Sequence, residues 1–239
     1  MNIDPIGVAF LGLVCLMLPW AAFRSNQRLR DSQGVPRRAY ITSVVFTQGV
    51  MLTLALAAAS RNWVFLFPAP TFTWTQVFLG AAVLLPAVAS IPIRWTYRSD
   101  ADRRRLAWMV PRRWPDMAWW VPISFLAGIG EEIVYRGVAF ELLDRLLGGW
   151  YPAVAICVLA FALAHYVQGV IAILTIAVLS AALHVIVRAT GNLYTVMAVH
   201  VLYDILAGTF AMYAYRRWEA HPRRNPMNIP TAPATPDGK

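Results

Sequence analysis

Two adjacent glutamates lie in the middle of an apolar stretch of the sequence. Glu131 and Glu132 open the segment EEIVYR, which closes on Arg136. An ionised side chain at the centre of a membrane helix costs about 2.5–3.5 kcal/mol on insertion scales, so an acid in such a place indicates a functional site. Three further ionisable residues lie in other apolar stretches: His165, His200 and Asp204. These residue types can together build a hydrolytic site inside a membrane.

The spacing of the acidic cluster predicts different surroundings for its two glutamates. On an α-helix, residues four apart share a face, whereas adjacent residues differ by about 100°. Glu132 is therefore predicted to form an ion pair with Arg136, which makes its burial tolerable. Glu131 is left free toward a polar cavity, where a carboxylate can act as a general base on water. The alternative is an ion-pair network with a purely structural role.

Each of the two histidines has a neighbour one helical turn away. His165 follows Phe161 in FALAH, and His200 precedes Asp204 in HVLYD. A single histidine in an apolar helix is commonly a packing residue, but two of them with acids in separate spans favour a site. Glu131, His165, His200 and Asp204 are also ligand types that a catalytic zinc takes. The HEXXH motif is absent, so a metal site would have to be assembled across helices.

Other polar residues are predicted to be structural. His184 lies near the end of a span and His221 lies in the tail. Glu141 and Arg145 are four residues apart and should form a surface ion pair at the membrane edge. The serines within spans, Ser124 and Ser180, lack the Gly-x-Ser-x-Gly context of a serine nucleophile. Small residues at 127–130 and at Gly137 should let neighbouring helices approach closely.

The composition is that of a protein built mainly from membrane helices. Of its 239 residues, 59% are hydrophobic and 14% are charged, and the mean hydropathy is +0.53. These values are typical of polytopic membrane proteins rather than soluble globular domains. The two cysteines, Cys15 and Cys157, lie in apolar runs and are predicted to be small core residues without a disulfide.

Apolar runs of about 20 residues, the length that crosses a bilayer, recur along the chain. We expect seven spans, at residues 6–23, 41–59, 74–93, 117–143, 152–166, 170–187 and 193–215. A re-entrant segment around residues 117–150 would change the number to six or eight. The predicted fold class is therefore all-α, a polytopic membrane helix bundle of about seven transmembrane helices.

Basic residues gather in three groups, at 24–38, 94–113 and 216–224. Seven spans put all three groups on one side, which the positive-inside rule makes cytoplasmic, with the N-terminus outside and the C-terminus inside. The segment 101–115 could lie flat on the anionic leaflet as a short interfacial helix. The net charge of +9 is thus predicted to face membrane lipids, and nucleic acid is not expected as a partner.

These patterns divide the chain into three parts. Residues 1–116 are predicted to be N-terminal transmembrane helices with basic cytoplasmic loops, and residues 117–215 hold every candidate catalytic residue. Residues 216–239 are expected to form a cytoplasmic disordered tail, because this end of the chain is polar and rich in proline.

The ordered set Glu131-Glu132-x-x-x-Arg136, Phe161-x-x-x-His165 and His200-x-x-x-Asp204 resembles the motifs of the CPBP family. This family comprises the CAAX proteases and the bacteriocin-processing or immunity enzymes, also called the Abi family. The resemblance covers roughly residues 117–215, which would be the catalytic core helices. It implies an all-helical intramembrane endopeptidase similar to the type II CAAX prenyl protease, which removes the last three residues from prenylated proteins.

The resemblance also implies a role for each matching residue. Glu131 would activate the attacking water with His165, while His200 and Asp204 would hold or polarise the scissile carbonyl. The family often has asparagine where this chain has Asp204. An ionised aspartate cannot donate a hydrogen bond, so Asp204 is protonated, orients His200 or ligates a metal. Both a zinc-dependent and a metal-free glutamate mechanism stay open.

Two other classes of function compete with proteolysis. Acids and histidines within spans also build proton relays, as in a proton-coupled transporter. A non-catalytic bacteriocin-immunity or scaffold protein could keep the fold and bind a partner. The arginine-rich, lysine-poor composition is typical of a bacterial protein from a high-GC genome. We therefore expect a multi-pass protein of the bacterial inner membrane that acts on a membrane-embedded or lipidated peptide.

Overall fold

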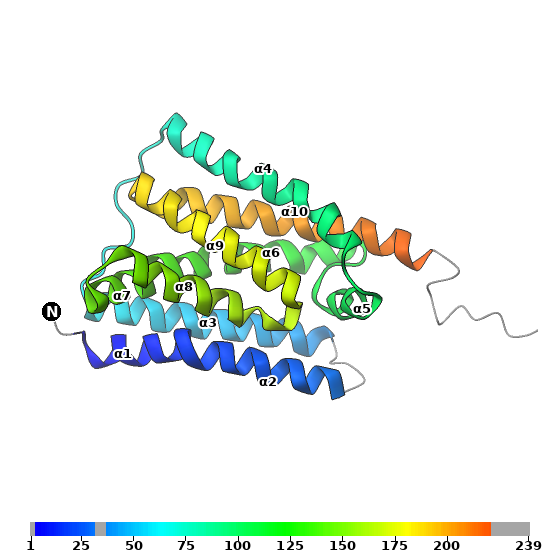
Figure 1. Ribbon diagram of the computed structural model, residues 1–239, viewed down its shortest axis with the longest axis horizontal. Helices are drawn as coiled ribbons and strands as arrows, with labels where there is room; N and C mark the ends of the chain where they lie inside the picture. Colours follow the sequence, from blue (N-terminus) through cyan, green and yellow to red (C-terminus); the bar gives the residue numbers. More distant parts are fainter. Residues whose placement is uncertain (1–2, 32–36, 221–239) are drawn as a thin grey trace, which may run out of the picture.

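The computed structural model describes residues 3–31 and 37–220, and all regular structure in these ranges is helical. The N-terminal half contains α1 (Pro5–Gly12), the π-helix η1 (Leu13–Met17), α2 (Leu18–Asp31), α3 (Arg37–Arg61), α4 (Trp74–Thr96) and α5 (Asp100–Met109). The all-α helix bundle predicted from the sequence is confirmed (Figure 1).

The second half begins with a long apolar segment. It consists of the 3-10 turn η2 (Trp114–Asp116), α6 (Met117–Glu131), the π-helix η3 (Glu132–Ala139) and α7 (Phe140–Leu147). The chain continues with α8 (Trp150–Ala164), the 3-10 turn η4 (Tyr166–Gln168), α9 (Val170–Thr190) and α10 (Tyr194–Glu219). Gly148 and Gly191, both with φ of 68°, end α7 and α9 in the left-handed conformation that glycine adopts without strain.

Six helical segments of the described chain are long and apolar enough to cross a membrane. They are Pro5–Gln27, Arg37–Arg61, Trp74–Thr96, Trp114–Leu147, Val170–Thr190 and Tyr194–Glu219. The seventh predicted span, at residues 152–166, corresponds to α8, which has only 15 residues. At 1.5 Å per residue α8 is about 22 Å long, shorter than the hydrocarbon core of about 30 Å.

The basic groups lie at one end of the bundle. Figure 1 places the ends of α2 and α10, the start of α3, and α5 at the same end. Ion pairs join α3 and α10 to the segment that follows α5, since Arg37 contacts Asp116 at 2.9 Å and Arg112 contacts Glu219. The expected helix in the segment 101–115 is present as α5. Clustering of arginines at one end agrees with a positively charged membrane face.

Helix α10 extends past residue 216, where the tail was predicted to begin, and continues through Arg216 and Arg217 to Glu219. The Tyr215 hydroxyl donates a hydrogen bond to the backbone oxygen of Arg103 in α5. The predicted disorder of residues 221–239 falls outside the described residues.

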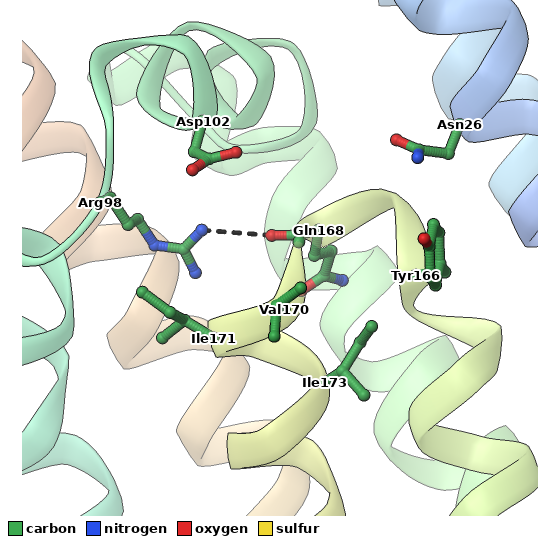
Figure 2. Close-up of a pocket in the computed structure, with 9 residues that line it drawn as sticks. Asn26, Arg98, Asp102, Tyr166, Gln168, Val170, Ile171 and Ile173 are labelled. Carbon is green, nitrogen blue, oxygen red and sulfur yellow. Dashed lines mark hydrogen bonds between the residues drawn. The ribbon is translucent and has the colours of Figure 1, made fainter.

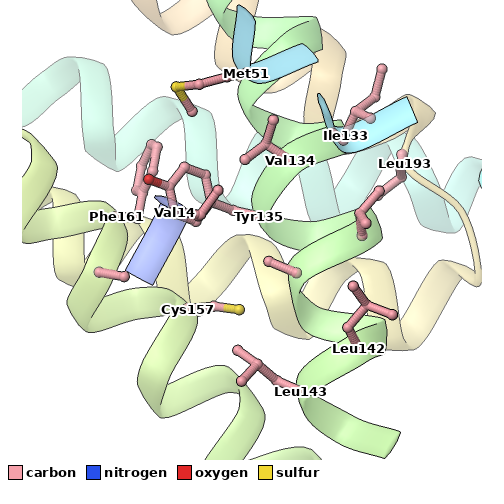
Figure 3. Packing of buried hydrophobic residues seen from close by; sticks show 14 of the residues in the cluster. Val14, Met51, Ile133, Val134, Tyr135, Leu142, Leu143, Cys157, Phe161 and Leu193 are labelled. Carbon is pink, nitrogen blue, oxygen red and sulfur yellow. The ribbon is translucent and has the colours of Figure 1, made fainter. Parts of the chain in front are cut away.

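The best-packed part of the molecule surrounds η3. Seven of its eight residues are buried, and their side chains meet α1, η1, α3 and α8 (Figure 3). The Tyr135 ring packs edge-on against Phe161 of α8, with centroids 4.8 Å apart. Cys157 is fully buried in this cluster, and both Cys15 and Cys157 are free thiols, as predicted.

Close approach of α6 and α10 depends on Gly128. A Cβ added there would lie 2.6 Å from the Cγ2 atom and 2.8 Å from the backbone nitrogen of Val201. Only glycine therefore allows this contact, which fixes the acidic end of α6 beside the start of α10. The predicted packing role of the small residues at 127–130 is confirmed at this position.

Candidate active site

The acidic pair lies near the middle of the apolar segment Trp114–Leu147, at the junction of α6 and η3. Glu132 is completely buried and Glu131 is 8% exposed. The segment changes from α-helical to π-helical hydrogen bonding directly after Glu131. Such π-helical turns are frequent at functional sites. The sequence prediction assumed a regular α-helix and did not include this one.

Glu132 has a cation on its own helix. The Nη1 atom of Arg136 donates to Glu132 Oε1 at 3.2 Å, and both side chains are fully buried. The Arg136 guanidinium also lies over the Phe161 ring, 4.5 Å from its centroid. The predicted contact between Glu132 and Arg136 is therefore present, and a cation–π contact adds to it.

His200 lies among three carboxylates. Its Nδ1 atom is 2.7 Å from Glu132 Oε1, a hydrogen-bonding distance. Its Nε2 atom is 3.8 Å from Glu131 Oε2 and 3.8 Å from Asp204 Oδ2. These two gaps are too long for direct hydrogen bonds, but they suit a small oxygen-bearing group between the imidazole and the carboxylates.

The hydrogen bonds of His200 and His165 assign protons to particular ring nitrogens. An ionised Glu132 only accepts, so His200 Nδ1 carries a proton and donates it. His165 ends α8, where its Nδ1 atom is 2.8 Å from the backbone oxygen of Phe161. A carbonyl oxygen also only accepts, so in the neutral ring Nε2 of His165 keeps its lone pair.

Phe161 stands between the two histidine rings. Its ring centroid is 4.7 Å from that of His165 and 6.3 Å from that of His200, with edge-to-face orientation in both cases. With the Phe-x-x-x-His spacing, Phe161 thus contacts His165 through both its backbone oxygen and its ring. This ring fixes the orientation of both imidazoles without adding a competing polar group.

Gln48 of α3 is a site residue that the sequence interpretation missed. It is 8% exposed, and its Nε2 atom donates a hydrogen bond to Glu131 Oε1. The prediction that Glu131 is left free is therefore wrong for one of its two oxygens. Gln48 binds Oε1, and Oε2 faces His200. The signal available in the sequence was an amide side chain within the apolar stretch 41–59.

A cavity of about 1220 Å³ joins these side chains. All four predicted catalytic residues line it, and so do Gln48 and Tyr40 from α3. Its walls are mostly apolar and come from α2, α3, α4, α5, α6, α8, α9 and α10. Residues that lie more than 60 positions apart in the sequence thus line the same cavity. Its mostly apolar lining with few polar groups is typical of a ligand-binding site.

The side chains do not form a ready metal-binding set. Across residues 3–31 and 37–220, no group of three His, Cys, Asp or Glu side chains could hold a metal ion as arranged. Glu131, His165, His200 and Asp204, the predicted zinc ligands, line one cavity but are not arranged as such a set. Bound zinc stays a prediction from the residue types.

Other polar residues of the spans were predicted to be structural. His184 is 2% exposed and packs against Phe140. The predicted ion pair between Glu141 and Arg145 is present, with 2.8 Å between Oε1 and Nη2. His221 lies outside the described residues.

Apolar helices that enclose two buried glutamates and partly buried His and Asp side chains define a polytopic membrane protein with a polar site within its spans. Residues 113–206 match the family model described as "Type II CAAX prenyl endopeptidase Rce1-like". The resemblance seen in the motifs is thereby confirmed for this part of the chain, which is similar to the CAAX-type proteases. No curated protein and no solved structure gives a significant match.

Proposed function

We propose that the protein is an intramembrane endopeptidase that hydrolyses a peptide bond in a membrane-associated or lipidated peptide or protein. The observation that carries this proposal is the shared cavity, in which a carboxylate, two histidines with assigned protons and an aspartate surround one space. The match of residues 113–206 to a protease family supports the same reaction class.

Glu131 acts as the general base in this proposal. Gln48 holds its Oε1 atom, so Oε2 is the oxygen that faces the imidazole of His200 and the adjacent space. A water placed there gives its proton to Glu131 as its oxygen attacks the carbonyl carbon. His165 lines the same cavity, and in this proposal its Nε2 lone pair accepts a hydrogen bond from this water.

His200 stabilises the carbonyl oxygen. Because Nδ1 already donates to Glu132, a second proton on Nε2 makes the ring an imidazolium whose Nε2–H points between Glu131 and Asp204. This N–H donates to the oxygen on which negative charge develops. Glu131 then returns its proton to the leaving amide nitrogen and the C–N bond breaks, which gives a carboxylic acid and an amine. Transfer of the remaining water proton from the acid to the amine leaves a carboxylate and an ammonium group.

Asp204 balances the charge of His200 rather than donating to the substrate. An ionised carboxylate has no hydrogen to donate, and Oδ2 lies 3.8 Å from His200 Nε2. Glu132, held by Arg136, fixes the ring from the other side. In place of a neutral donor, Asp204 therefore supplies a negative charge beside the protonated His200 ring.

The membrane setting belongs to the same proposal. We assign the protein to a bacterial inner membrane, with membrane lipids around it, the arginine-rich end in the cytoplasm and the N-terminus outside, because basic loops stay on the cytoplasmic side. Labelling of single cysteines introduced at Asn62 and at Arg112 from either side of the membrane checks this orientation. Labelling of the cysteine at position 62 from the cytoplasmic side would show the opposite orientation.

Hydrolysis is tested with the purified full chain in lipid vesicles. Lipidated and unlipidated membrane peptides are incubated with the protein in water enriched in oxygen-18, and the products are identified by mass spectrometry. We expect new C-termini that carry oxygen-18, and none with Glu131→Gln. Proton or solute flux across the vesicles without any cleavage would instead favour a transporter. Metal analysis of the active preparation decides whether zinc is present.

A further inference from the structure

Two side chains that line the catalytic cavity donate hydrogen bonds to backbone oxygens of other helical segments. The Nη1 atom of Arg98 donates to the backbone oxygen of Gln168 in η4 at 3.2 Å (Figure 2). The Nε1 atom of Trp120 in α6 donates to the backbone oxygen of Asp204 in α10 at 3.0 Å. Of these two bonds, the second ends on a residue of the proposed catalytic set. The proposed hydrolytic steps give Trp120 no part, so its contact with Asp204 needs its own explanation.

Gly208 gives the indole access to this oxygen. In an α-helix a carbonyl accepts from the backbone N–H four residues later, and its second lone pair can take another donor. A side chain at position 208 would lean over the Asp204 carbonyl, because Cα–Cβ bonds tilt toward the helix N-terminus. A Cβ added to Gly208 would collide with Nε1 of Trp120 and lie 2.8 Å from its Cδ1 atom. The contact therefore needs glycine at this position.

A second close approach between α6 and α10 lies two helical turns away, where Gly128 faces Val201. Val201 and Gly208 are seven residues apart on α10, and Gly128 and Trp120 are eight residues apart on α6. At 1.5 Å per residue these separations are about 10.5 Å and about 12 Å, so the two antiparallel helices stay in register between the contacts. Asp204 lies on the stretch of α10 that both contacts hold against α6.

The side chain of Asp204 is held less firmly than that of His200. In the described part of the chain the Asp204 carboxylate makes no hydrogen bond, and its Oδ2 atom lies 3.8 Å from His200 Nε2. The imidazole of His200, in contrast, is fixed through Nδ1 by Glu132 at 2.7 Å. The place of the Asp204 carboxylate is therefore set by its backbone, whose oxygen Trp120 holds.

We propose that Trp120 is a positioning residue that keeps the Asp204 carboxylate beside the imidazole of His200. The proposal rests on the proposed function, in which this negative charge accompanies the protonated His200 ring. Loss of the indole N–H would release the Asp204 oxygen from α6. This turn of α10 could then shift, and the carboxylate would move away from His200.

Peptide cleavage by full-length variants in vesicles tests this role. Trp120→Phe keeps an aromatic ring but loses the N–H, so kcat should fall about three- to tenfold, as expected for one hydrogen bond, with KM nearly unchanged. Gly208→Ala should cause a similar loss, because the added Cβ displaces the indole. The matched controls are Trp119→Phe, at the adjacent tryptophan, and Gly49→Ala, where an added Cβ meets nothing within 4 Å. Losses of the same size in the controls overturn the proposal.

A double-mutant cycle shows whether Trp120 acts through Asp204. In the Asp204→Ala protein the carboxylate is already absent, so the addition of Trp120→Phe should lower kcat no further. Additive losses would mean that Trp120 acts through general packing or through another group, and they overturn the proposal. A rise in KM in place of the fall in kcat also overturns it, because Trp120 would then contribute to substrate binding instead.

Chemical modification of His200 separates this proposal from the proposed function. Diethyl pyrocarbonate reacts with a neutral imidazole nitrogen, and a nearby negative charge favours the protonated ring. Mass spectrometry measures the modification of His200 at one pH, without any peptide substrate. The reaction should be faster in Trp120→Phe, as in Asp204→Ala, and unchanged in Trp119→Phe, and this result supports the positioning role even if no peptide is hydrolysed. Modification at the wild-type rate in Trp120→Phe overturns the role even if the protein cleaves peptides.

Discussion

Two Glu–Arg pairs with the same spacing lie on one continuous helical segment in different surroundings. In η3 the pair Glu132–Arg136 is completely buried, and in α7 the side chains of Glu141 and Arg145 are 39% and 23% exposed. Each pair makes its contact, because residues four apart share a helix face. Only the buried pair has a further partner among the catalytic groups, His200. Position along the span, rather than spacing, therefore separates a functional pair from a structural one.

The largest expected effect on the cleavage rate comes from changing His200, the further partner of the buried pair Glu132–Arg136. His200→Gln deletes the donor to the carbonyl oxygen, and loss of one such donor costs about 10²–10³-fold in kcat. The rate of peptide cleavage in vesicles measures it. His184→Gln, a change at a buried histidine outside the catalytic groups, is the matched control. Equal losses in the two variants would mean that His200 acts only through packing.

Breaking the buried pair should cost stability as well as activity. Arg136→Gln leaves Glu132 buried without its cation, and removal of one partner of a buried ion pair lowers the free energy of unfolding by about 3–5 kcal/mol. Unfolding in detergent, followed by tryptophan fluorescence, gives the value. Restoration of wild-type stability by Glu132→Gln in the same chain would show that the uncompensated charge causes the loss.

A smaller effect is expected from the amide that holds Glu131. Gln48→Leu removes the hydrogen bond to Oε1 and should lower kcat about tenfold with little change in KM, because a hydrogen bond to a charged group contributes about 1.5–3 kcal/mol. Gln76→Leu is the matched control, since Gln76 is a buried glutamine that caps α4. A change in KM alone would contradict a positioning role for Gln48.

The exposed pair should give the smallest effect. Arg145→Gln breaks a partly exposed ion pair, and such pairs contribute about 1 kcal/mol or less. Loss of the hydrogen bond from Arg145 to the backbone oxygen of Asn62 adds to this only modestly. The midpoint of thermal unfolding and the cleavage rate should both stay close to wild type. A loss as large as that of Arg136→Gln would remove the distinction between the pairs.

Much of this arrangement follows from the sequence, and the remainder depends on tertiary contacts. Apolar runs and arginine groups predict the helices and their common basic end, and four-residue spacing predicts both Glu–Arg pairs. The π-helix at η3 and the shortness of α8 do not follow from hydropathy. Gln48 was missed because its contact with Glu131 spans 83 residues and joins different helices. The partner of His200 at Nδ1 is likewise set by how α10 packs against η3.

The central claim is that one buried acid, Glu131, performs the chemistry while acids elsewhere on the same segment hold the fold. The most direct measurement compares peptide cleavage by Glu131→Gln and Glu141→Gln in the same vesicles, with equal amounts of folded protein. Loss of a general base predicts a fall of about 10²–10⁴-fold for Glu131→Gln and a nearly unchanged rate for Glu141→Gln. Cleavage by Glu131→Gln at the wild-type rate would contradict the account.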